Sequence, residues 1–201
     1  MIAATEFRMR SGPDRMVESF QQAKARHREF RLVAYETARR DALTAYALGP
    51  ELRLEDVDAH ALEVWRTRWA RRRHAIGAGG WDWSSLVERQ PRRAAILPLA
   101  IWYGDDLCGL ALGRASRRRA SGVRHTITIT HAERRPEPPE VLLHGLIVPI
   151  SVSVGRNYGA ALGAKRLRLR NPDPKLLRYY QLLGFRVAWR GGRPVYCEQE
   201  I

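Results

Sequence analysis

The spacing of apolar residues divides the chain into a helical first part and a sheet-forming second part. Over residues 13–48 apolar side chains recur at intervals of three and four, which predicts a long helix that ends at Gly49-Pro50. A second helix is expected over residues 54–74. Residues 77–83 form a glycine-rich joint that carries two tryptophans. The amino-terminal segment is therefore predicted to be helical.

Beyond Pro91 the apolar period changes from helical to the alternation of strands. The run over residues 141–148 is almost uniformly apolar, a pattern typical of a central strand that is buried on both faces. Helices are expected over residues 149–162 and 174–183. Strands are expected over residues 96–103, 107–115, 124–130, 141–148, 165–170, 185–190 and 194–198.

One short segment is ambiguous, because residues 149–154 also alternate as a strand would. Ile150, Val154 and Tyr158 form a helical stripe, and Pro149 suits the first turn of a helix, so a helix is favoured. Such a helix would join strands 141–148 and 165–170 as parallel neighbours through a right-handed crossover.

Composition narrows the class of protein. The chain has 201 residues, of which 45% are hydrophobic and 28% charged, as in folded globular proteins. We find neither an apolar run long enough to span a bilayer nor a signal-peptide pattern, which predicts a cytoplasmic protein without a membrane partner. Cys108 and Cys197 lack metal-ligand spacing, so neither a metal site nor a disulfide is expected.

The net charge of +14 favours an anionic partner: nucleic acid, a polyphosphate cofactor or an acidic protein. Of the 35 basic residues only three are lysines, a skew that GC-rich coding could also produce. Three clusters could form basic patches: Arg68 with Arg71, Arg72 and Arg73; Arg89 with Arg92 and Arg93; and Arg117, Arg118 and Arg119 with Arg124.

A motif near the carboxyl end resembles a known family. Residues 171–185 combine a helix with the step Tyr180-Gln-Leu-Leu-Gly184-Phe185. This pattern resembles the fourth helix and following strand of the GCN5-related N-acetyltransferase (GNAT) family. The resemblance covers about residues 94–201. It implies an α/β (α+β) fold with a mixed, mostly antiparallel sheet of six or seven strands and helices on both faces. Residues 1–93 would be a helical segment packed on that core, within one structural domain.

The resemblance also implies an activity and candidate residues. Members transfer an acetyl group from acetyl-CoA to an amine, and Tyr180 matches the position of their general acid, whereas Tyr179 is expected to lie in the core. The family's usual spacing places its asparagine at Asp173 and not at Asn171. Asp173 before Pro174 also has the pattern of a helix N-cap, so either residue is a candidate for contact with the cofactor.

The family's phosphate loop, Arg/Gln-x-x-Gly-x-Gly/Ala before the third helix, is not found after Val148. The segment from Arg156 to Ala161 matches this sequence pattern, but it lies too close to the next expected strand for a helix to follow it. The prediction is a shortened or missing loop. If coenzyme A binds, its contacts are expected from the start of the shortened helix and from the next loop: Leu146, Ile147, Val148, Ser151, Ser153, Asn171 and Asp173.

His144 on the expected central strand, or His131 on another, could act as a base, and Glu140 or Glu133 could reach an ammonium group. Two functions remain open. The first hypothesis is an acetyl-CoA-dependent N-acyltransferase that acts on a small-molecule or macromolecular amine, with Tyr180, His144 and Glu140 as catalytic residues. The alternative is an inactive GNAT-fold protein whose arginine-rich surface holds nucleic acid or a protein.

Overall fold

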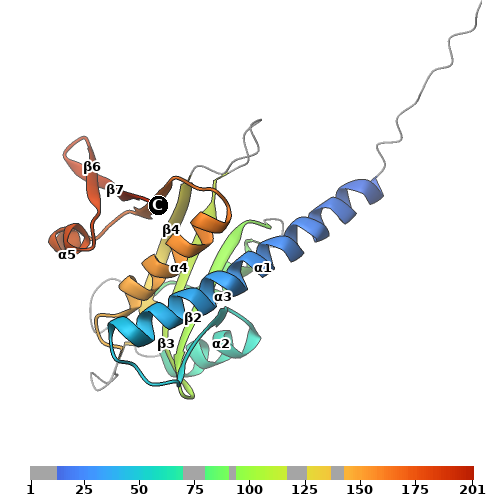
Figure 1. Cartoon of the computed structure of the whole chain (residues 1–201), viewed down its shortest axis with the longest axis horizontal. Helices are drawn as coiled ribbons and strands as arrows, with labels where there is room; N and C mark the ends of the chain where they lie inside the picture. Colours follow the sequence, from blue (N-terminus) through green and yellow to red (C-terminus); the bar gives the residue numbers. More distant parts are fainter. Residues whose placement is uncertain (1–12, 70–79, 91–93, 117–125, 137–142) are drawn as a thin grey trace, which may run out of the picture.

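The computed structural model describes residues 13–69, 80–90, 94–116, 126–136 and 143–201, with side chains from residue 20 onward in the first range. Its elements alternate between helices and one sheet (Figure 1). In chain order they are α1 (Pro13–Ala45), β1 (Leu52–Asp56), α2 (Ala59–Val64), the π-helical segment η1 (Trp65–Trp69), α3 (Trp83–Glu88), β2 (Ile96–Tyr103), β3 (Asp106–Ala115), β4 (Thr126–Arg134), α4 (Ile147–Ala161), β5 (Arg166–Arg170), the 3₁₀ turn η2 (Pro174–Leu176), α5 (Leu177–Leu182), β6 (Arg186–Arg190) and β7 (Arg193–Glu200).

A single sheet of seven strands runs in the order β1-β2-β3-β4-β5-β7-β6. Every neighbouring pair is antiparallel except β4 and β5, which are parallel and are joined through α4. The predicted mixed, mostly antiparallel sheet is confirmed. No described helix is long and apolar enough to cross a membrane.

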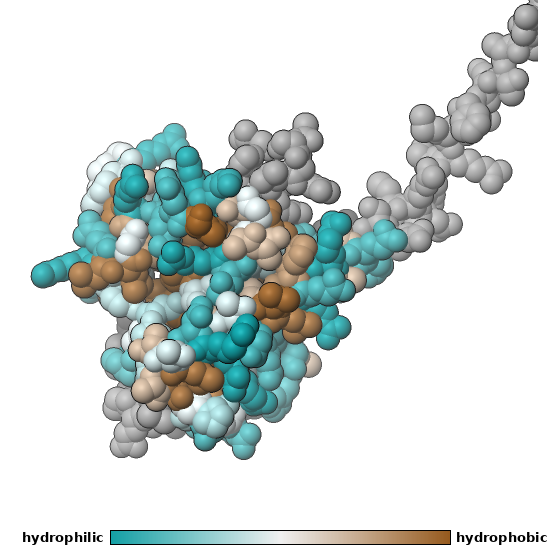
Figure 2. All heavy atoms as spheres, viewed as in Figure 1, coloured by the Kyte–Doolittle hydropathy of each residue, from teal (hydrophilic) through white to brown (hydrophobic). Residues whose placement is uncertain are grey.

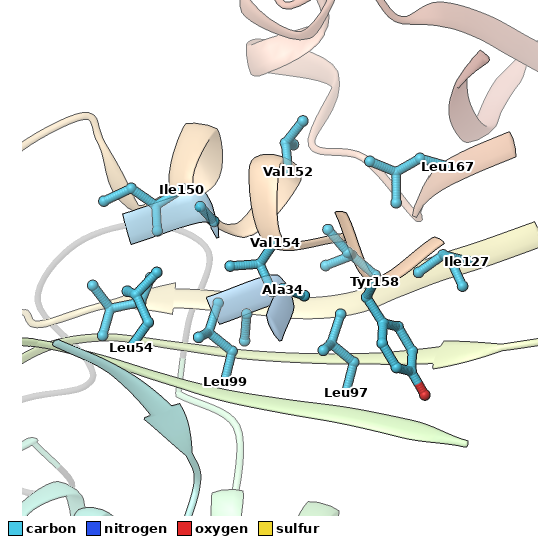
Figure 3. Close-up of a cluster of buried hydrophobic side chains, with 14 of the residues drawn as sticks. Ala34, Leu54, Leu97, Leu99, Ile127, Ile150, Val152, Val154, Tyr158 and Leu167 are labelled. Carbon is cyan, nitrogen blue, oxygen red and sulfur yellow. The ribbon is translucent and has the colours of Figure 1, made fainter. Parts of the chain in front are cut away.

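Helices α1 and α4 lie side by side over one face of the sheet (Figure 1). The buried residues of α1, among them Ala34, Tyr35, Ala38 and Ala42, recur at intervals of one, three and four, as a buried helical stripe requires. Figure 3 shows Val154 and Tyr158 of α4 together with Ala34 of α1 and with residues of the sheet, and the same buried cluster contains residues from six strands, β1 to β5 and β7. In the view of Figure 1, the exposed surface of the molecule is largely hydrophilic, with scattered hydrophobic patches (Figure 2).

Two glycines let α4 approach the sheet closely. A Cβ atom at Gly155 would lie 2.9 Å from Leu167 Cδ1, and one at Gly159 would lie 3.0 Å from Ile127 Cγ1. Both neighbouring side chains are fully buried and have little room to move. These two glycines, one helical turn apart, therefore have a packing role.

The opposite face of β2 and β3 is covered by α2, η1 and α3. Its core is rich in tryptophan and contains Trp65, Trp69, Trp83 and Trp102 together with Leu110. Because Trp102 belongs to this cluster and its neighbour Ile101 to the α1/α4 cluster, β2 is buried on both faces. Helices thus lie on both faces of the sheet, as predicted.

Buried polar groups fasten α1 to the sheet. Arg31 donates to the Asp56 carboxylate through Nε at 2.7 Å and through a terminal nitrogen at 2.6 Å. The Tyr35 hydroxyl lies 2.8 Å from both Asp56 Oδ1 and the Pro98 carbonyl oxygen. Nearer the start of α1, His27 Nδ1 lies 2.8 Å from the hydroxyl oxygen of Tyr158, which belongs to α4. These contacts fix the helix at two places along its length.

One predicted element starts too early and another is wrong. Of the helix expected over 54–74, residues 59–69 are helical, but residues 52–56 form strand β1, which pairs with β2, and Asp58 caps α2 by accepting a hydrogen bond from the Ala61 amide; residues 70–74 lie outside the described part. The strand expected over 141–148 is absent from its described part: residues 143–146 form a turn, and α4 begins at Ile147. The parallel neighbour of β5 is therefore β4. A continuous apolar run does not by itself distinguish a buried strand from a turn that leads into a buried helix.

Candidate active site

The parallel pairing of β4 and β5 ends before β4 does. The two strands pair from Thr126 with Arg166 to Ile129 with Leu169; β5 ends one residue later, at Arg170, whereas β4 continues to Arg134. A bulge in β4 lies where its pairing with β5 ends, because Ile129 and His131 oppose consecutive residues of β3. The extra residue, Thr130, donates its hydroxyl hydrogen to the Leu112 carbonyl oxygen at 3.0 Å. Bulges of this kind redirect the side chains that follow them.

The turn before α4 leaves backbone donors without acceptors. The Leu146 amide donates to the Leu143 carbonyl oxygen at 2.9 Å, and Gly145 has a φ of +78°. Within the described residues the amides of Ile147 and Val148 have no acceptor, as is usual in the first turn of a helix. Pro149 contributes no amide hydrogen. The start of α4 therefore offers two backbone donors and the positive end of a helix dipole.

Helix α5 lies next to this turn. The Tyr179 hydroxyl donates to the Gly145 carbonyl oxygen at 3.0 Å, which connects α5 to the start of α4. Asp173 begins η2 as an N-cap and accepts from the Lys175 amide at 2.9 Å, so its predicted capping role is confirmed. Asn171, with a φ of +49°, is exposed, and its backbone N–H donates to the Val195 carbonyl oxygen.

Tyr180 is buried, with 8% of its surface exposed. Its hydroxyl has no hydrogen-bond partner in the part of the chain that the structure describes. Burial, followed by the nearby charge of Asp173, raises the pKa of Tyr180 to about 12. The phenol therefore keeps its proton throughout the neutral range and is available as a hydrogen-bond donor. The preceding residue, Tyr179, is half-buried and packs against the core, and its hydroxyl makes the hydrogen bond to the turn before α4.

His131 follows the bulge and lies among aromatic rings. Its ring centroid is 5.1 Å from that of Trp81 and 6.4 Å from that of Trp83, both in edge-to-face geometry. Its Nδ1 atom lies 3.0 Å from the Thr130 hydroxyl oxygen. Burial, followed by the positive charge of Arg170 at the end of β5, lowers the pKa of His131. The imidazole is therefore neutral at neutral pH and able to accept a proton.

Glu133 has a structural partner that the sequence did not reveal. It is buried, and its carboxylate accepts from the Gly80 amide at 2.8 Å and from Trp83 Nε1 at 2.6 Å. The predicted contact of Glu133 with a substrate ammonium stays untested, but this carboxylate already orients Trp83 beside His131. No sequence pattern could have found this pair, because its members lie 50 positions apart.

The other predicted residues are dispersed. His144 is exposed in the turn before α4 and does not lie on a strand, which corrects that expectation, and Glu140 lies outside the described residues. The buried Ser151 hydroxyl donates to the Ile147 carbonyl oxygen at 2.7 Å within α4. Ser153 instead lines a groove of about 420 Å³ between α1, α4 and the end of α5.

The end of β4 at Arg134 also changes the position of the phosphate loop. The segment between the parallel strand and the next helix is residues 135–146, so the shortened loop predicted from a strand at 141–148 loses its basis. The sequence departure remains, because Leu142 and Ile147 stand where the pattern around Gly145 requires Arg or Gln and Gly or Ala. Residues 137–142 lie outside the described part.

No protein-family model matches the sequence, and no curated protein matches it. Solved structures do match. Naa50 of Arabidopsis thaliana, in complex with the bisubstrate analogue CoA-Ac-MVNAL, is 11% identical with a TM-score of 0.52, over 75% of this chain and 99% of that one. The ribosomal-protein-S18-alanine N-acetyltransferase of Escherichia coli is 15% identical, with a TM-score of 0.50 over 75% and 94%. A candidate GNAT acetyltransferase of Desulfovibrio desulfuricans is 15% identical, with a TM-score of 0.52 over 74% and 98%.

Proposed function

We propose that this protein, which has the fold of the GNAT acetyltransferases, transfers an acyl group from acyl-coenzyme A to an amine. One observation carries the proposal: beyond Ile129 the β4 backbone is not paired with β5, and beside it lies a helix start whose first two amides have no acceptor in the described residues. A polyanionic cofactor with a long thin arm needs a helix N-terminus for its phosphates and unpaired strand backbone for the arm, and both features are present.

The residues at the start of α4 fit a pyrophosphate group. Ile147 is bulkier than the residue in the family pattern, but its side chain is buried in the core beside Gly109, where a Cβ atom would lie 2.6 Å from Ile147 Cδ1. Because the bulk points into the core, the Ile147 and Val148 amides are not covered by that side chain. We assign these two amides to the phosphates. When bound, the cofactor would supply an activated acyl thioester.

Two side chains and one stretch of backbone would carry the chemistry. His131, held neutral by its surroundings, would take a proton from the attacking amine. Tyr180, with its proton retained, would donate a hydrogen bond toward the leaving sulfur. Beyond Ile129 the β4 backbone is not paired with β5, so its amides on that side are suited to hold a developing oxyanion.

Isothermal titration with coenzyme A and acetyl-CoA tests the binding step. Val148→Pro removes one amide hydrogen in the first turn of α4, where proline is tolerated, and Val148→Ala is the matched control. A hydrogen bond to a charged group contributes about 1.5–3 kcal/mol, so Val148→Pro should weaken binding by about tenfold or more. Val148→Ala should bind within about twofold of the parent.

Absence of coenzyme A binding by the parent protein would contradict the proposal. Equal binding by Val148→Pro and Val148→Ala would remove the start of α4 from the site.

A further inference from the structure

The outer side of the carboxyl-terminal half of the sheet carries a dense group of arginines. Residues that are directly paired on neighbouring strands project to the same side. The pairs Arg114 with Thr128, Thr128 with Arg168, and Arg168 with Glu198 place one row across four strands, and Arg186 continues it on β6. We name this side the arginine face. Its members are Arg114, Arg166, Arg168, Arg170, Arg186, Arg190, Arg193, Glu198, Glu200, Tyr196, Thr126 and Thr128.

No described helix packs on the arginine face. The residues that alternate with its members, such as Leu167, Leu169 and Cys197, are buried on the inner side with α4 and α5. Helices α2 and α3 pack on β2 and β3 instead. Six of the seven arginines are exposed, and Arg168 is half-buried.

The charge of the face is unbalanced, with seven arginines against two glutamates. Glu198 pairs with Arg168 at 2.5 Å and with Arg166 at 3.7 Å. By contrast, four arginines at the end of β5 and in the β6–β7 hairpin form no ion pair within the described residues: Arg170, Arg186, Arg190 and Arg193. The electrostatic field of this excess positive charge attracts an anionic partner.

The chemistry of the face favours a nucleic acid over an acidic protein. All of its cations are guanidinium groups, which bind phosphate in a planar, bidentate manner and stack on bases. The Arg168 guanidinium lies 4.5 Å from the ring centroid of Tyr196, so a planar cation and an aromatic ring, both half-buried, already contact each other on this face. A protein partner would need apolar anchor pockets, yet the face has no large aliphatic side chain among its members.

We infer that the arginine face binds single-stranded nucleic acid, with phosphates on the arginines and bases stacked against Tyr196. The row from β3 to β6 crosses four strand spacings, about 19 Å, which is wide enough for a strand rather than a single phosphate. This inference does not rest on the acyl transfer proposed above. Failure of coenzyme A binding would leave it standing, and failure of nucleic-acid binding would leave the acyl transfer standing.

The test uses the full chain and a fluorescein-labelled oligouridylate of about 16 nucleotides, measured by anisotropy between about 50 and 200 mM NaCl. The face variant is Arg186→Ala with Arg190→Ala and Arg193→Ala. The control variant is Lys24→Ala with Arg26→Ala and Arg28→Ala, which removes the same charge from exposed positions of α1.

Each phosphate contact on a single strand contributes about 0.7 to the slope of log affinity against log salt. The face variant should therefore lose about two units of slope and bind at least tenfold more weakly at 50 mM, while the control keeps the parent slope. Tyr196→Ala should weaken binding by about fivefold or more through lost stacking, and Tyr196→Phe should restore it.

Four outcomes would count against the inference, three against nucleic-acid binding and one against its single-strand part. The first is no binding by the parent at 50 mM NaCl, and the second is an equal loss in the face and control variants, which would indicate charge alone. The third is displacement of the oligonucleotide by polyglutamate at equal charge concentration, which would favour an acidic protein. Tighter binding of a duplex with no effect of Tyr196→Ala would overturn the single-strand and stacking part.

Discussion

Removing the Asp56 carboxylate should reveal how strongly α1 is fastened to the sheet. In the native protein this carboxylate accepts two hydrogen bonds from Arg31 and lies 2.8 Å from the Tyr35 hydroxyl. Asp56→Ala leaves Tyr35 with the Pro98 carbonyl oxygen, but Arg31, only 6% exposed, keeps a single acceptor among the described residues, the Ile96 carbonyl oxygen at 3.4 Å. Most of the expected loss in the free energy of unfolding therefore comes from leaving the buried Arg31 guanidinium without its carboxylate.

Breaking a buried ion pair on one side costs about 3–5 kcal/mol. Because a third of the Asp56 side chain is exposed and water can reach the gap, the lower end of that range, about 3 kcal/mol, is expected. The control is Glu36→Ala on the same helix, whose contacts with Arg39 and Arg40 are 3.9 and 3.8 Å long and exposed; it should cost about 0.5 kcal/mol or less.

Urea unfolding followed by tryptophan fluorescence and circular dichroism measures these values. With an m value of about 2 kcal/mol/M, Asp56→Ala should lower the midpoint by about 1.5 M. If the unpaired charge is the cause, adding Arg31→Met should recover much of the loss, because an apolar side chain needs no partner there. A double variant no more stable than Asp56→Ala, or a single variant as stable as Glu36→Ala, would refute the reasoning.

Three further changes test the site and its support. Tyr180→Phe should lower acyl transfer at least tenfold in a coenzyme A release assay with an unchanged melting temperature, and an unchanged rate would remove Tyr180 from the mechanism. Arg170→Ala removes a positive charge that disfavours protonated His131. The pKa of His131 in an NMR titration should therefore move up toward 6.5, and the acid limb of kcat/KM should move with it. A downward shift, or no shift, would be inconsistent with this electrostatic effect of Arg170. His131 also makes stability pH-dependent: its folded pKa lies below 6.5, so its contribution is complete above 6.5 and is lost as pH falls through the folded value. Gly155→Val should destabilise the fold by about 1–3 kcal/mol in urea unfolding through overlap with Leu167, and a stabilised variant would show that α4 can move away from the sheet.

The sequence predicted those parts of the fold whose pattern is local. The long helix and the hairpin of β2 and β3 follow from periodicity alone, and the step from Tyr180 to Phe185 marked the final helix and strand. Strand β1 was missed because its Leu52 and Leu54 alternate over only five residues, just before helix-start signals. The misplaced central strand has a similar cause, since Gly145 turns the chain within an apolar run.

The candidate site could be predicted only in part, because most of its contacts are distant in sequence. Tyr180 and the start of α4 were identified from a motif and from helix chemistry. The environment of His131 was not, since Trp81, Trp83 and Arg170 meet it only after the sheet has formed. The arginine face is likewise a product of strand register, in which single arginines from separate strands align.

The contact between His27 and Tyr158 has a consequence for biosynthesis. The two residues are separated by 131 positions, so at about 5–20 residues per second the ribosome needs about 7–26 seconds to make the second after the first. Throughout that interval the buried stripe of α1, with Ala34 and Ala38, has no α4 to pack against. The nascent chain thus presents an exposed apolar helix surface to chaperones, and any translation pause before Ile147 prolongs that exposure.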